Sequence, residues 1–307
     1  VPYSLFFGRE CDVTQFFNFF VPPGVKGKTV TIVHDMAYKA CPETVKSRTR
    51  HWLNLVLKKS CNRADIIITV SQFSKDELVR YLGVPKEKIR VMHLGVDQSK
   101  FSNHQSRERI DAVRGKYHIK ERYYLYLGTI EPRKNIKRLL EAYGRLHDKM
   151  SNAPQLVLAG GRGWLCDDIY ETAKALDLGD DILFTGYVEE GEAPVLLAGA
   201  MAFLFPSLYE GFGIPPLEAM ACGTPVLSAD KASLPEVLGD AALLINPESV
   251  DEICMGMERL AVDRALRSEL SRKGSERVKI YTWERSAHIL KGIYEELVTL
   301  EERHAVV

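Results

Sequence analysis

The chain has 307 residues, of which 46% are hydrophobic and 27% are charged. This length and composition predict two globular domains with buried cores and exclude a low-complexity or repeat protein. The 41 basic and 41 acidic residues cancel, so no nucleic-acid partner is expected. No apolar run reaches the roughly 18 residues of a membrane-spanning helix, and the start lacks the basic region of a signal peptide.

The charges are unevenly placed along the chain. Residues 1–100 contain 16 Lys and Arg and 9 Asp and Glu, a net charge of +7, which leaves 25 against 32, or −7, for residues 101–307. The basic first part predicts an anionic partner, such as a membrane surface or a phosphorylated acceptor. Six scattered cysteines without a CxxC pair are typical of reduced thiols, so we expect a cytoplasmic protein without disulfides or a zinc site.

The first hundred residues alternate between strand and helix patterns. The predicted elements are strands at 11–17, 29–35, 66–70 and 89–92 and helices at 43–60 and 72–82. The helix at 43–60 has a basic face, which we interpret as a solvated surface, with contact to an anionic membrane as the alternative. His34 ends a β-branched strand on the side where ligands bind, so it is a candidate site residue, although a lone histidine is more often structural.

The first domain is expected to be incomplete. Only about four strands are visible in it, and no strand with a glycine-rich loop precedes Cys11, whereas a doubly wound domain normally has about six strands. At about 30 residues for each strand–helix–strand unit, the missing part is on the order of 60 to 90 residues.

The second domain begins with two cations near the end of a strand. A strand predicted at 123–127 leads into a loop with Arg133 and Lys134, and Asn135 begins an amphipathic helix. Cations at this place are well positioned to bind a diphosphate. The glycines that follow, in the segment GGRGW at 160–164, lack the spacing of a dinucleotide fingerprint, which disfavours a dehydrogenase and predicts a close turn. The other elements predicted here are helices at 105–116, 167–176 and 189–198 and strands at 155–159 and 182–184.

The segment MAFLFPSLYEGFGIPPLEAMACGTPVLS, residues 201–228, combines a strand, a glycine loop, a helix at 214–222 and a second strand. Ligands of parallel sheets bind beyond the carboxyl ends of the strands, where this loop lies. Gly211 and Gly213 allow the backbone to approach a ligand, and the N–H groups at the helix start favour an anion. Glu210 and Glu218 bracket this place. The start, the end and the dipole of the helix can each account for one of these residues alone. Taken together, the glycines, the helix start and the two glutamates suit an anion flanked by hydroxyls, such as a nucleotide sugar.

Two last strands, predicted at 234–238 and 242–245, complete a second sheet of about six strands, and helices fill the remainder. We therefore predict an α/β protein with two Rossmann-like, doubly wound parallel-sheet domains.

The segment at 201–228, with two glutamates separated by seven residues, resembles the signature of the retaining glycosyltransferases of family 4, or glycosyl transferases group 1, which have the GT-B fold. The similarity continues through residues 234–247. The resemblance implies that Glu218 holds the ribose hydroxyls of a donor nucleotide and that Glu210 contacts hydroxyls of the transferred sugar. The donor-binding backbone that it implies comprises Gly211, Phe212, Gly213, Ile214 and Pro215.

The same resemblance extends to other parts of the chain. It implies that the segment Glu-Pro-Arg-Lys-Asn, with Arg133 and Lys134, neutralises the leaving nucleoside diphosphate and that His34 faces the transferred sugar. It further implies a first, acceptor-side domain at 1–102, a donor domain at 103–285 and a terminal helix at 286–307 that crosses back to the first domain, with the two domains facing a cleft.

The function implied is retaining transfer of a sugar from a nucleoside-diphosphate donor, with GDP-mannose as first candidate, to a glycan or lipid-linked acceptor in polysaccharide assembly. No DxD motif follows a strand, so no metal and no cofactor are expected. We expect a cytoplasmic protein that contacts the inner membrane face peripherally. The alternatives are another GT-B enzyme, such as a nucleotide-sugar epimerase or a sugar phosphorylase, or a non-catalytic nucleotide-sugar-binding module. A glycosidase is disfavoured because Glu218, within a helix, suits a ribose better than an anomeric carbon.

Overall fold

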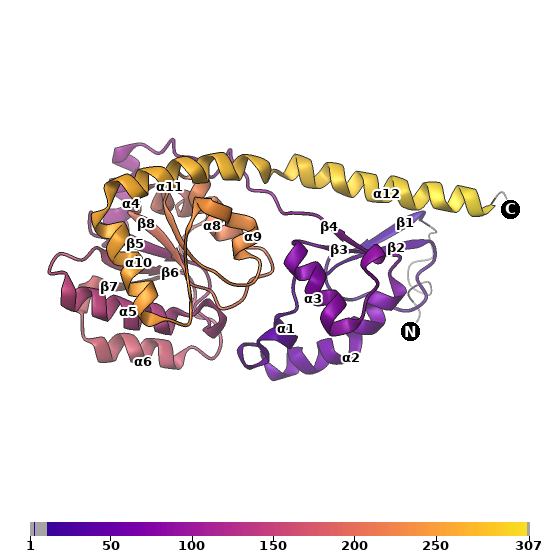
Figure 1. The fold of residues 1–307 in the computed structure, drawn as a ribbon, viewed down its shortest axis with the longest axis horizontal. Helices are drawn as coiled ribbons and strands as arrows, with labels where there is room; N and C mark the ends of the chain where they lie inside the picture. Colours follow the sequence, from indigo (N-terminus) through magenta and orange to yellow (C-terminus); the bar gives the residue numbers. More distant parts are fainter. Residues whose placement is uncertain (1–2, 4–10, 306–307) are drawn as a thin grey trace. The chain divides into compact units, whose positions relative to one another are not determined.

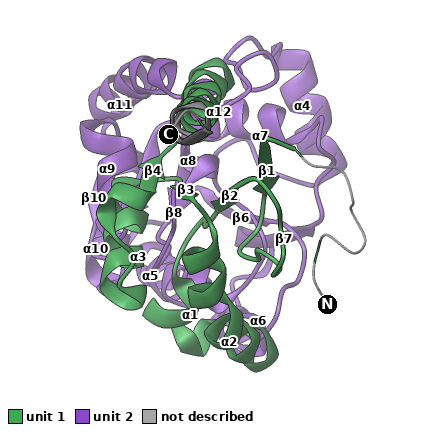
Figure 2. Cartoon of the chain, turned by 90° about the vertical axis from the view of Figure 1, so that its right-hand side faces the viewer, with its two compact units in different colours: residues 1–95, 283–307 green, residues 96–282 purple. Residues whose placement is uncertain are grey.

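The computed structural model describes residue 3 and residues 11–305. The chain divides into two compact units, which Figure 2 shows in different colours: unit 1 comprises residues 1–95 and 283–307, and unit 2 comprises residues 96–282. The domain boundaries predicted at residues 102 and 285 lie a few residues past these divisions. The expectation that no strand precedes Cys11 concerns residues that, apart from residue 3, lie outside the described part.

Unit 1 is built on a parallel sheet whose described strands follow the chain order β1-β2-β3-β4. The strands are β1 (Val13–Phe16), β2 (Lys28–Ile32), β3 (Ile66–Thr69) and β4 (Ile89–Val91). The helices between them are α1 (Ala37–Ala40), α2 (Ser47–Arg63) and α3 (Gln72–Leu82), with short 3-10 turns at η2 (Pro42–Thr44) and η3 (Lys86–Lys88). The four strands predicted from the sequence are thus all present.

Helices cover both faces of this sheet (Figure 1). Because the strands follow one another in order and parallel crossovers are right-handed, α2 and α3 lie on one face, where Leu57 and Leu78 pack in one core cluster with Ile67. The next residue, Ile68, points to the opposite face and packs with Leu297 of the terminal helix α12 (Trp283–Ala305). The last helix of the chain therefore completes the core of unit 1.

Unit 2 contains a six-stranded parallel sheet in the order β10-β9-β8-β5-β6-β7. The strands are β5 (Tyr123–Leu127), β6 (Gln155–Ala159), β7 (Ile182–Gly186), β8 (Ala202–Phe205), β9 (Val226–Ala229) and β10 (Leu243–Ile245). The helices are α4 (Arg107–Lys116), α5 (Ile136–Lys149), α6 (Asp167–Leu176), α7 (Ala193–Gly199), α8 (Ile214–Ala221), α9 (Leu234–Leu238), α10 (Val250–Val262) and α11 (Arg264–Arg277). The chain reverses its direction of winding between β5 and β8, which is where doubly wound sheets bind ligands.

Several predicted elements differ from the structure, among them the helix predicted at 43–60, which forms α2 at Ser47–Arg63. Residues 234–238, predicted as a strand, form helix α9, because Pro235 fits a first helical turn and Gly239, with φ of 56°, ends it. Helix α7 starts at Ala193, four residues after its predicted start at 189. Strand β2 ends at Ile32, so His34 lies in the connection beyond the strand.

The glycine turn after β6 approaches the loop after β5 closely, as the sequence predicted. Gly160 has φ of 143°, and a Cβ atom there would lie 1.9 Å from the carbonyl oxygen of Gly128. We expect Gly160→Ala to lower the free energy of unfolding by roughly 2 kcal/mol or more, because the backbone must move and the conformation is strained. Gly161→Ala is the matched control, since a Cβ atom there meets nothing within 4 Å. Urea unfolding of both variants measures the difference, and equal stabilities would contradict the prediction.

Candidate active site

The candidate site of unit 2 is formed by the loops that follow β5 and β8, the two strands at the point of reversal. The first loop contains the 3-10 turn η4 (Pro132–Lys134), and the second contains Tyr209 and Glu210. The two loops are joined directly, because the backbone N–H of Leu208 donates to the carbonyl oxygen of Arg133 at 2.9 Å.

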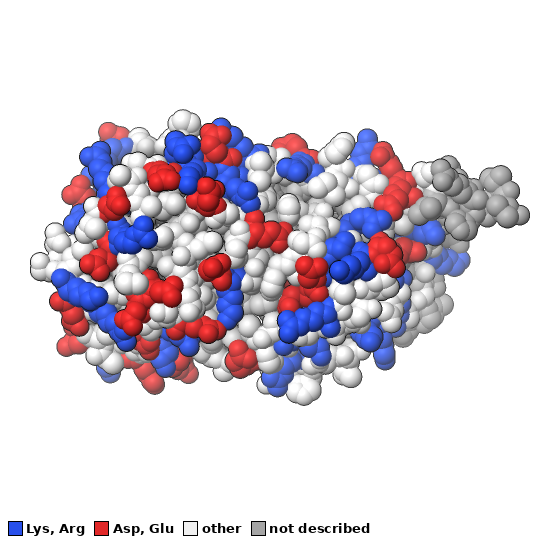
Figure 3. Space-filling model, viewed as in Figure 1, with Lys and Arg blue, Asp and Glu red and all other residues white. Residues whose placement is uncertain are grey.

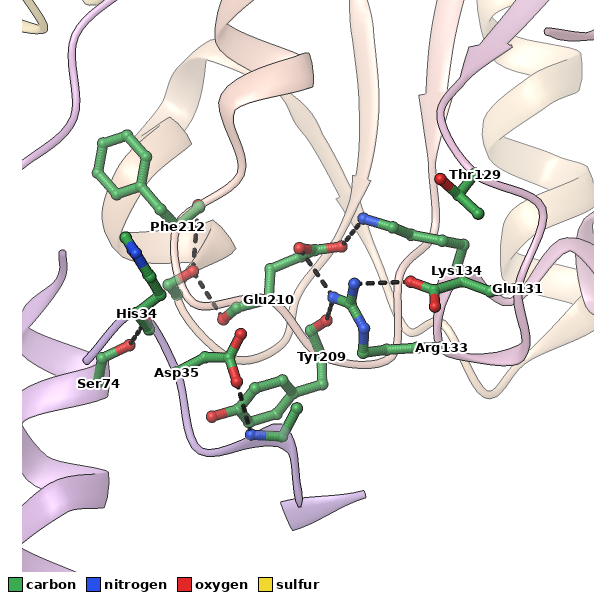
Figure 4. A network of polar contacts seen from close by, with 12 residues as sticks. His34, Asp35, Ser74, Thr129, Glu131, Arg133, Lys134, Tyr209, Glu210 and Phe212 are labelled. Carbon is green, nitrogen blue, oxygen red and sulfur yellow. Dashed lines mark hydrogen bonds and ion pairs between the residues drawn. The ribbon is translucent and has the colours of Figure 1, made fainter. Parts of the chain in front are cut away.

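Two cations and two carboxylates meet at this junction (Figure 4). Lys134 Nζ lies 2.6 Å from Glu210 Oε1, and Arg133 Nη1 lies 3.0 Å from Glu210 Oε2. Arg133 Nη2 also donates to Glu131 Oε1 at 2.7 Å. Arg133 and Lys134, predicted together in one loop, are thus brought to Glu210, predicted in another. Glu131 was missed, although its place in the segment Glu-Pro-Arg-Lys-Asn could have indicated it.

The cluster is largely withdrawn from solvent. The side chains of Lys134 and Glu210 are 12% and 10% exposed, and that of Glu131 is 2% exposed. Burial alone would raise the pKa of the Glu210 carboxyl, but the charges of Lys134 and Arg133 outweigh it and hold that pKa below its usual range. Glu210 is therefore ionised in the free protein and can accept hydrogen bonds.

The conformation of the loop after β5, which contains Arg133 and Lys134, is fixed by local structure. Pro132 begins the 3-10 turn, and Asn135, with φ of 61°, ends it in the left-handed conformation. The Asn135 side-chain amide donates to the carbonyl oxygens of Pro206 at 3.1 Å and Pro247 at 2.7 Å. Asn135 thereby ties the loops after β5, β8 and β10 to one another, a role that the sequence did not reveal.

The loop after β8, which contains Glu210, is supported by residues at the start of α9. Ser233 Oγ lies 3.0 Å from the carbonyl oxygen of Glu210 and 3.1 Å from that of Phe212, and it donates to one of them at a time. A Cβ atom at Gly213 would lie 2.7 Å from Leu234 Cδ2, so only glycine fits this close packing at φ of 103°. Helix α9, which the sequence analysis interpreted as a strand, therefore supports the predicted donor-binding backbone.

The start of α8 offers fewer N–H groups than expected. Ile214 is its first residue, and Pro215 and Pro216 follow in the first turn. Since proline has no N–H group, the donors left in this turn are mainly those of Gly213 and Ile214. The cations of the neighbouring loop are therefore the larger source of positive charge for an anion.

Glu218 lies apart from the cation cluster, one turn into α8. Burial raises the pKa of its carboxyl to about 7, and the charge of Lys100 opposes this shift. A half-buried carboxyl that titrates near neutrality is unusual, and such groups concentrate at functional sites.

His34 belongs to unit 1, and its position relative to Glu210 stays a prediction. Its backbone carbonyl accepts a hydrogen bond from Ser74 Oγ at 3.2 Å, and its ring meets that of Phe19 edge-on, with 6.1 Å between centroids. These contacts anchor the residue at the carboxyl end of the unit 1 sheet.

The residues that the structure describes also bear on metal binding, membrane insertion and disulfide formation. No group of three or more His, Cys, Asp or Glu side chains there could hold a metal ion, and no described helix has the length and apolar character needed to cross a membrane. The six cysteines are free thiols, as predicted.

Comparison with protein families identifies two matches. The family described as glycosyl transferases group 1 matches residues 106–277, which is more than half of the chain. The family described as Glycosyltransferase Family 4 matches residues 15–100. Together these matches cover both units, and they confirm the resemblance found at residues 201–228.

Curated relatives include enzymes of O-antigen assembly. O-antigen chain mannosyltransferase B of Escherichia coli is 35% identical over 268 residues, which are 87% of this chain and 70% of that protein. O-antigen chain mannosyltransferase RfbU of Salmonella typhimurium is 32% identical over 227 residues, 74% of this chain and 58% of that protein. The serotype-specific mannosyltransferase WbdA of Escherichia coli is 32% identical over 246 residues, 79% of this chain and 30% of that protein.

Solved structures with the same fold include the following two. Sucrose-phosphate synthase of Thermosynechococcus elongatus superposes with a TM-score of 0.76 at 23% identity, covering 97% of this chain and 76% of that one. Anabaena HepE, solved in complex with UDP and glucose, has a TM-score of 0.75 at 19% identity, covering 87% and 72%. With the family matches and the two parallel-sheet units, these similarities show that the chain belongs to the glycosyl transferases group 1, glycosyltransferases of the GT-B fold.

Proposed function

We propose that this protein transfers a sugar from a nucleoside-diphosphate donor to an acceptor hydroxyl with retention of configuration. The observation that carries the proposal is the buried cluster in which Lys134 and Arg133 lie beside Glu210 at the ligand edge of the unit 2 sheet. In this reaction negative charge develops on the departing diphosphate. A preorganised cation that offsets such charge contributes roughly 3 kcal/mol to the transition state.

Each predicted donor residue has a role in this proposal. Lys134 faces the diphosphate, Arg133 lies beside it in the same cluster, and Glu210 accepts hydrogen bonds from hydroxyls of the transferred sugar. Glu218 accepts hydrogen bonds from the two ribose hydroxyls. The backbone from Phe212 to Pro215 lies against the sugar and the diphosphate. The acceptor attacks from the face that the diphosphate leaves, with a diphosphate oxygen as the base, and His34 lines the acceptor side.

The donor and acceptor are proposed from the relatives. Three of them are named mannosyltransferases, and two carry O-antigen chain in their names, which favours GDP-mannose as donor and a growing glycan or lipid-linked glycan as acceptor. The chain spans 70%, 58% and 30% of the lengths of these three relatives, so their activities serve as guides for substrates to test.

The experiment begins with thermal shifts in the presence of GDP-mannose, UDP-glucose, GDP and UDP. Transfer of the selected labelled sugar to an acceptor glycan, followed by NMR of the anomeric centre, then tests the reaction. An inverted product would contradict retention, and an epimerised donor or a requirement for phosphate would identify the epimerase or phosphorylase alternative. Donor binding without transfer or hydrolysis would identify a non-catalytic binding module.

We propose that the reaction needs no divalent metal, because Lys134, in a cluster that also contains Arg133, supplies positive charge at the diphosphate. Treatment with EDTA is therefore expected to leave the transfer rate unchanged within about twofold, against the 10²-fold or larger losses that follow removal of a required charge-stabilising group. A loss of activity that added Mg²⁺ or Mn²⁺ restores would contradict this.

We also propose that unit 1 contacts an anionic membrane surface through α2. Within Ser47–Arg63 there are five Lys and Arg residues and no Asp or Glu, and Figure 3 shows blue side chains along the lower edge of unit 1, where Figure 1 places α2. On the same helix Trp52 is 45% and Leu55 is 71% exposed. The Trp52 ring lies 5.9 Å from that of Phe20. Exposed aromatic and aliphatic groups beside an unbalanced basic face suit a lipid interface.

Charge reversal tests this surface. The double variant Lys58→Glu/Lys59→Glu is expected to lose more than tenfold in binding to phosphatidylglycerol vesicles, because each basic residue near such a surface contributes about 1 kcal/mol. The matched control, Lys149→Glu/Lys174→Glu, changes the net charge equally in unit 2, where both lysines are exposed. Co-sedimentation measures both variants, and equal losses would show that net charge, and not α2, determines binding.

A further inference from the structure

The cation cluster of unit 2 is electrically balanced before any donor arrives. Glu131 and Glu210 carry two negative charges, and Arg133 and Lys134 carry two positive charges, all within three connected ion pairs. A diphosphate therefore meets a cluster of zero net charge. The two cations can bind a diphosphate only if at least one of them gives up a carboxylate partner and pairs with the diphosphate instead.

Arg133 is held by more partners than Lys134. Its Nη1 donates to the carbonyl oxygen of Tyr209 at 2.8 Å and lies 3.0 Å from Glu210 Oε2, while its Nη2 donates to Glu131. The guanidinium thus binds the loop after β5 to the loop after β8. Among the described residues Lys134 has a single carboxylate partner, Glu210, and its ammonium lies 5.0 Å from the centre of the Phe205 ring.

Glu131 makes the position of Arg133 difficult to change. Its side chain is 2% exposed, Arg133 is its one ion-pair partner among the described residues, and its Oε2 atom has no hydrogen-bond partner there. Removing one partner of a buried ion pair leaves an uncompensated charge, which costs several kcal/mol. If Lys134 leaves instead, Glu210 keeps its contact with Arg133.

We propose that Glu131 is a positioning residue that holds Arg133 as a clamp between the two loops, so that Lys134 is the cation that exchanges Glu210 for the diphosphate of the donor. This inference rests on the proposed function and assigns different roles to Arg133 and Lys134. Arg133 acts by fixing Glu210 and its loop, whereas Lys134 contacts the leaving group. Glu210, released by Lys134, turns to the hydroxyls of the sugar.

The test compares three variants in binding of GDP by calorimetry, or of UDP if thermal shifts select it. The double variant Glu131→Gln/Arg133→Gln preserves the charge balance and is expected to bind within threefold of the wild type. Lys134→Gln is expected to lose at least tenfold. Asp251→Asn, which breaks the exposed pair with Arg145, is the control and is expected to bind normally. A double variant that binds as weakly as Lys134→Gln would show that Arg133 contacts the diphosphate itself and would overturn the inference.

Kinetics provide a second readout. Glu131→Gln is expected to lower kcat by roughly 10- to 100-fold with donor KM within threefold, the scale of a misplacement of about 1 Å. In an Arg133→Gln background the same change is expected to have no further effect, because Glu131 acts through Arg133. Additive losses would overturn the inference. A wild type that binds GDP or UDP but transfers no sugar contradicts the proposed function alone, since the binding comparison still decides between the two cations.

Discussion

Replacement of Lys134 by alanine is expected to lower kcat by roughly 10²- to 10³-fold, the usual result of removing one group that stabilises developing charge. The side chain of Lys134 is 12% exposed, and its ammonium lies 2.6 Å from Glu210 Oε1. In such surroundings water screens charges weakly. Negative charge grows on the diphosphate as the sugar leaves it, so the loss falls mainly on the transition state. Donor KM is expected to rise by a smaller factor.

Steady-state rates with a saturating acceptor measure both constants. The control is Lys137→Ala, which removes a lysine three residues further along that forms a half-exposed pair with Asp168 at 3.4 Å. Exposed pairs contribute about 0 to 1 kcal/mol, so this variant should retain normal kinetics. A Lys134→Ala enzyme with the kcat of the wild type would remove Lys134 from the proposed reaction.

The strands of unit 2 were predictable because they are buried on both faces. The runs Tyr123–Leu127 and Gln155–Ala159 are apolar except for Gln155, and they begin and end where the structure has them. Residues 234–238 also contain large apolar residues but form helix α9. So short a segment, with Leu234, Val237 and Leu238 as its large apolar residues, fits either structure. Pro235 in the first turn and the packing of Leu234 against Gly213 accompany the helix.

The residues of the cation cluster were predictable, but their pairing was not. Lys134 and Glu210 stand 76 positions apart, and each was identified from its own loop at the end of a strand. Their contact depends on strands β5 and β8 being neighbours in the sheet, which no local pattern specifies. Glu131 was overlooked although it stands two residues before Arg133 in the same segment, because its burial is a property of the folded protein and not of the local sequence.

Replacement of Glu218 by glutamine is expected to stabilise the fold at pH 8 while weakening donor binding. The pKa of this carboxyl is raised to about 7 in the folded protein, against about 4.3 in an unfolded chain. Ionisation therefore favours the unfolded state, so stability is lost as the pH rises from about 4 to 7 and the full penalty applies above pH 7. A shift of this size corresponds to at most about 4 kcal/mol. Chemical denaturation at pH 8 and pH 5 measures it, since the gain from glutamine should be much larger at pH 8 than at pH 5.

Donor binding should have the opposite dependence on pH. Only the ionised Glu218 accepts hydrogen bonds from both ribose hydroxyls, so wild-type affinity should rise about tenfold per pH unit below pH 7 and level off above it. The Glu218→Gln variant should bind weakly at every pH, with no inflection near 7. Calorimetric titrations with donor from pH 5.5 to 8.5 test both curves. An inflection that persists in the variant would assign the titration to another group, and a pH-independent wild type would show that Glu218 does not hold the ribose. A residue that destabilises its own fold and is required for binding would be retained for the ligand, because its packing alone disfavours it.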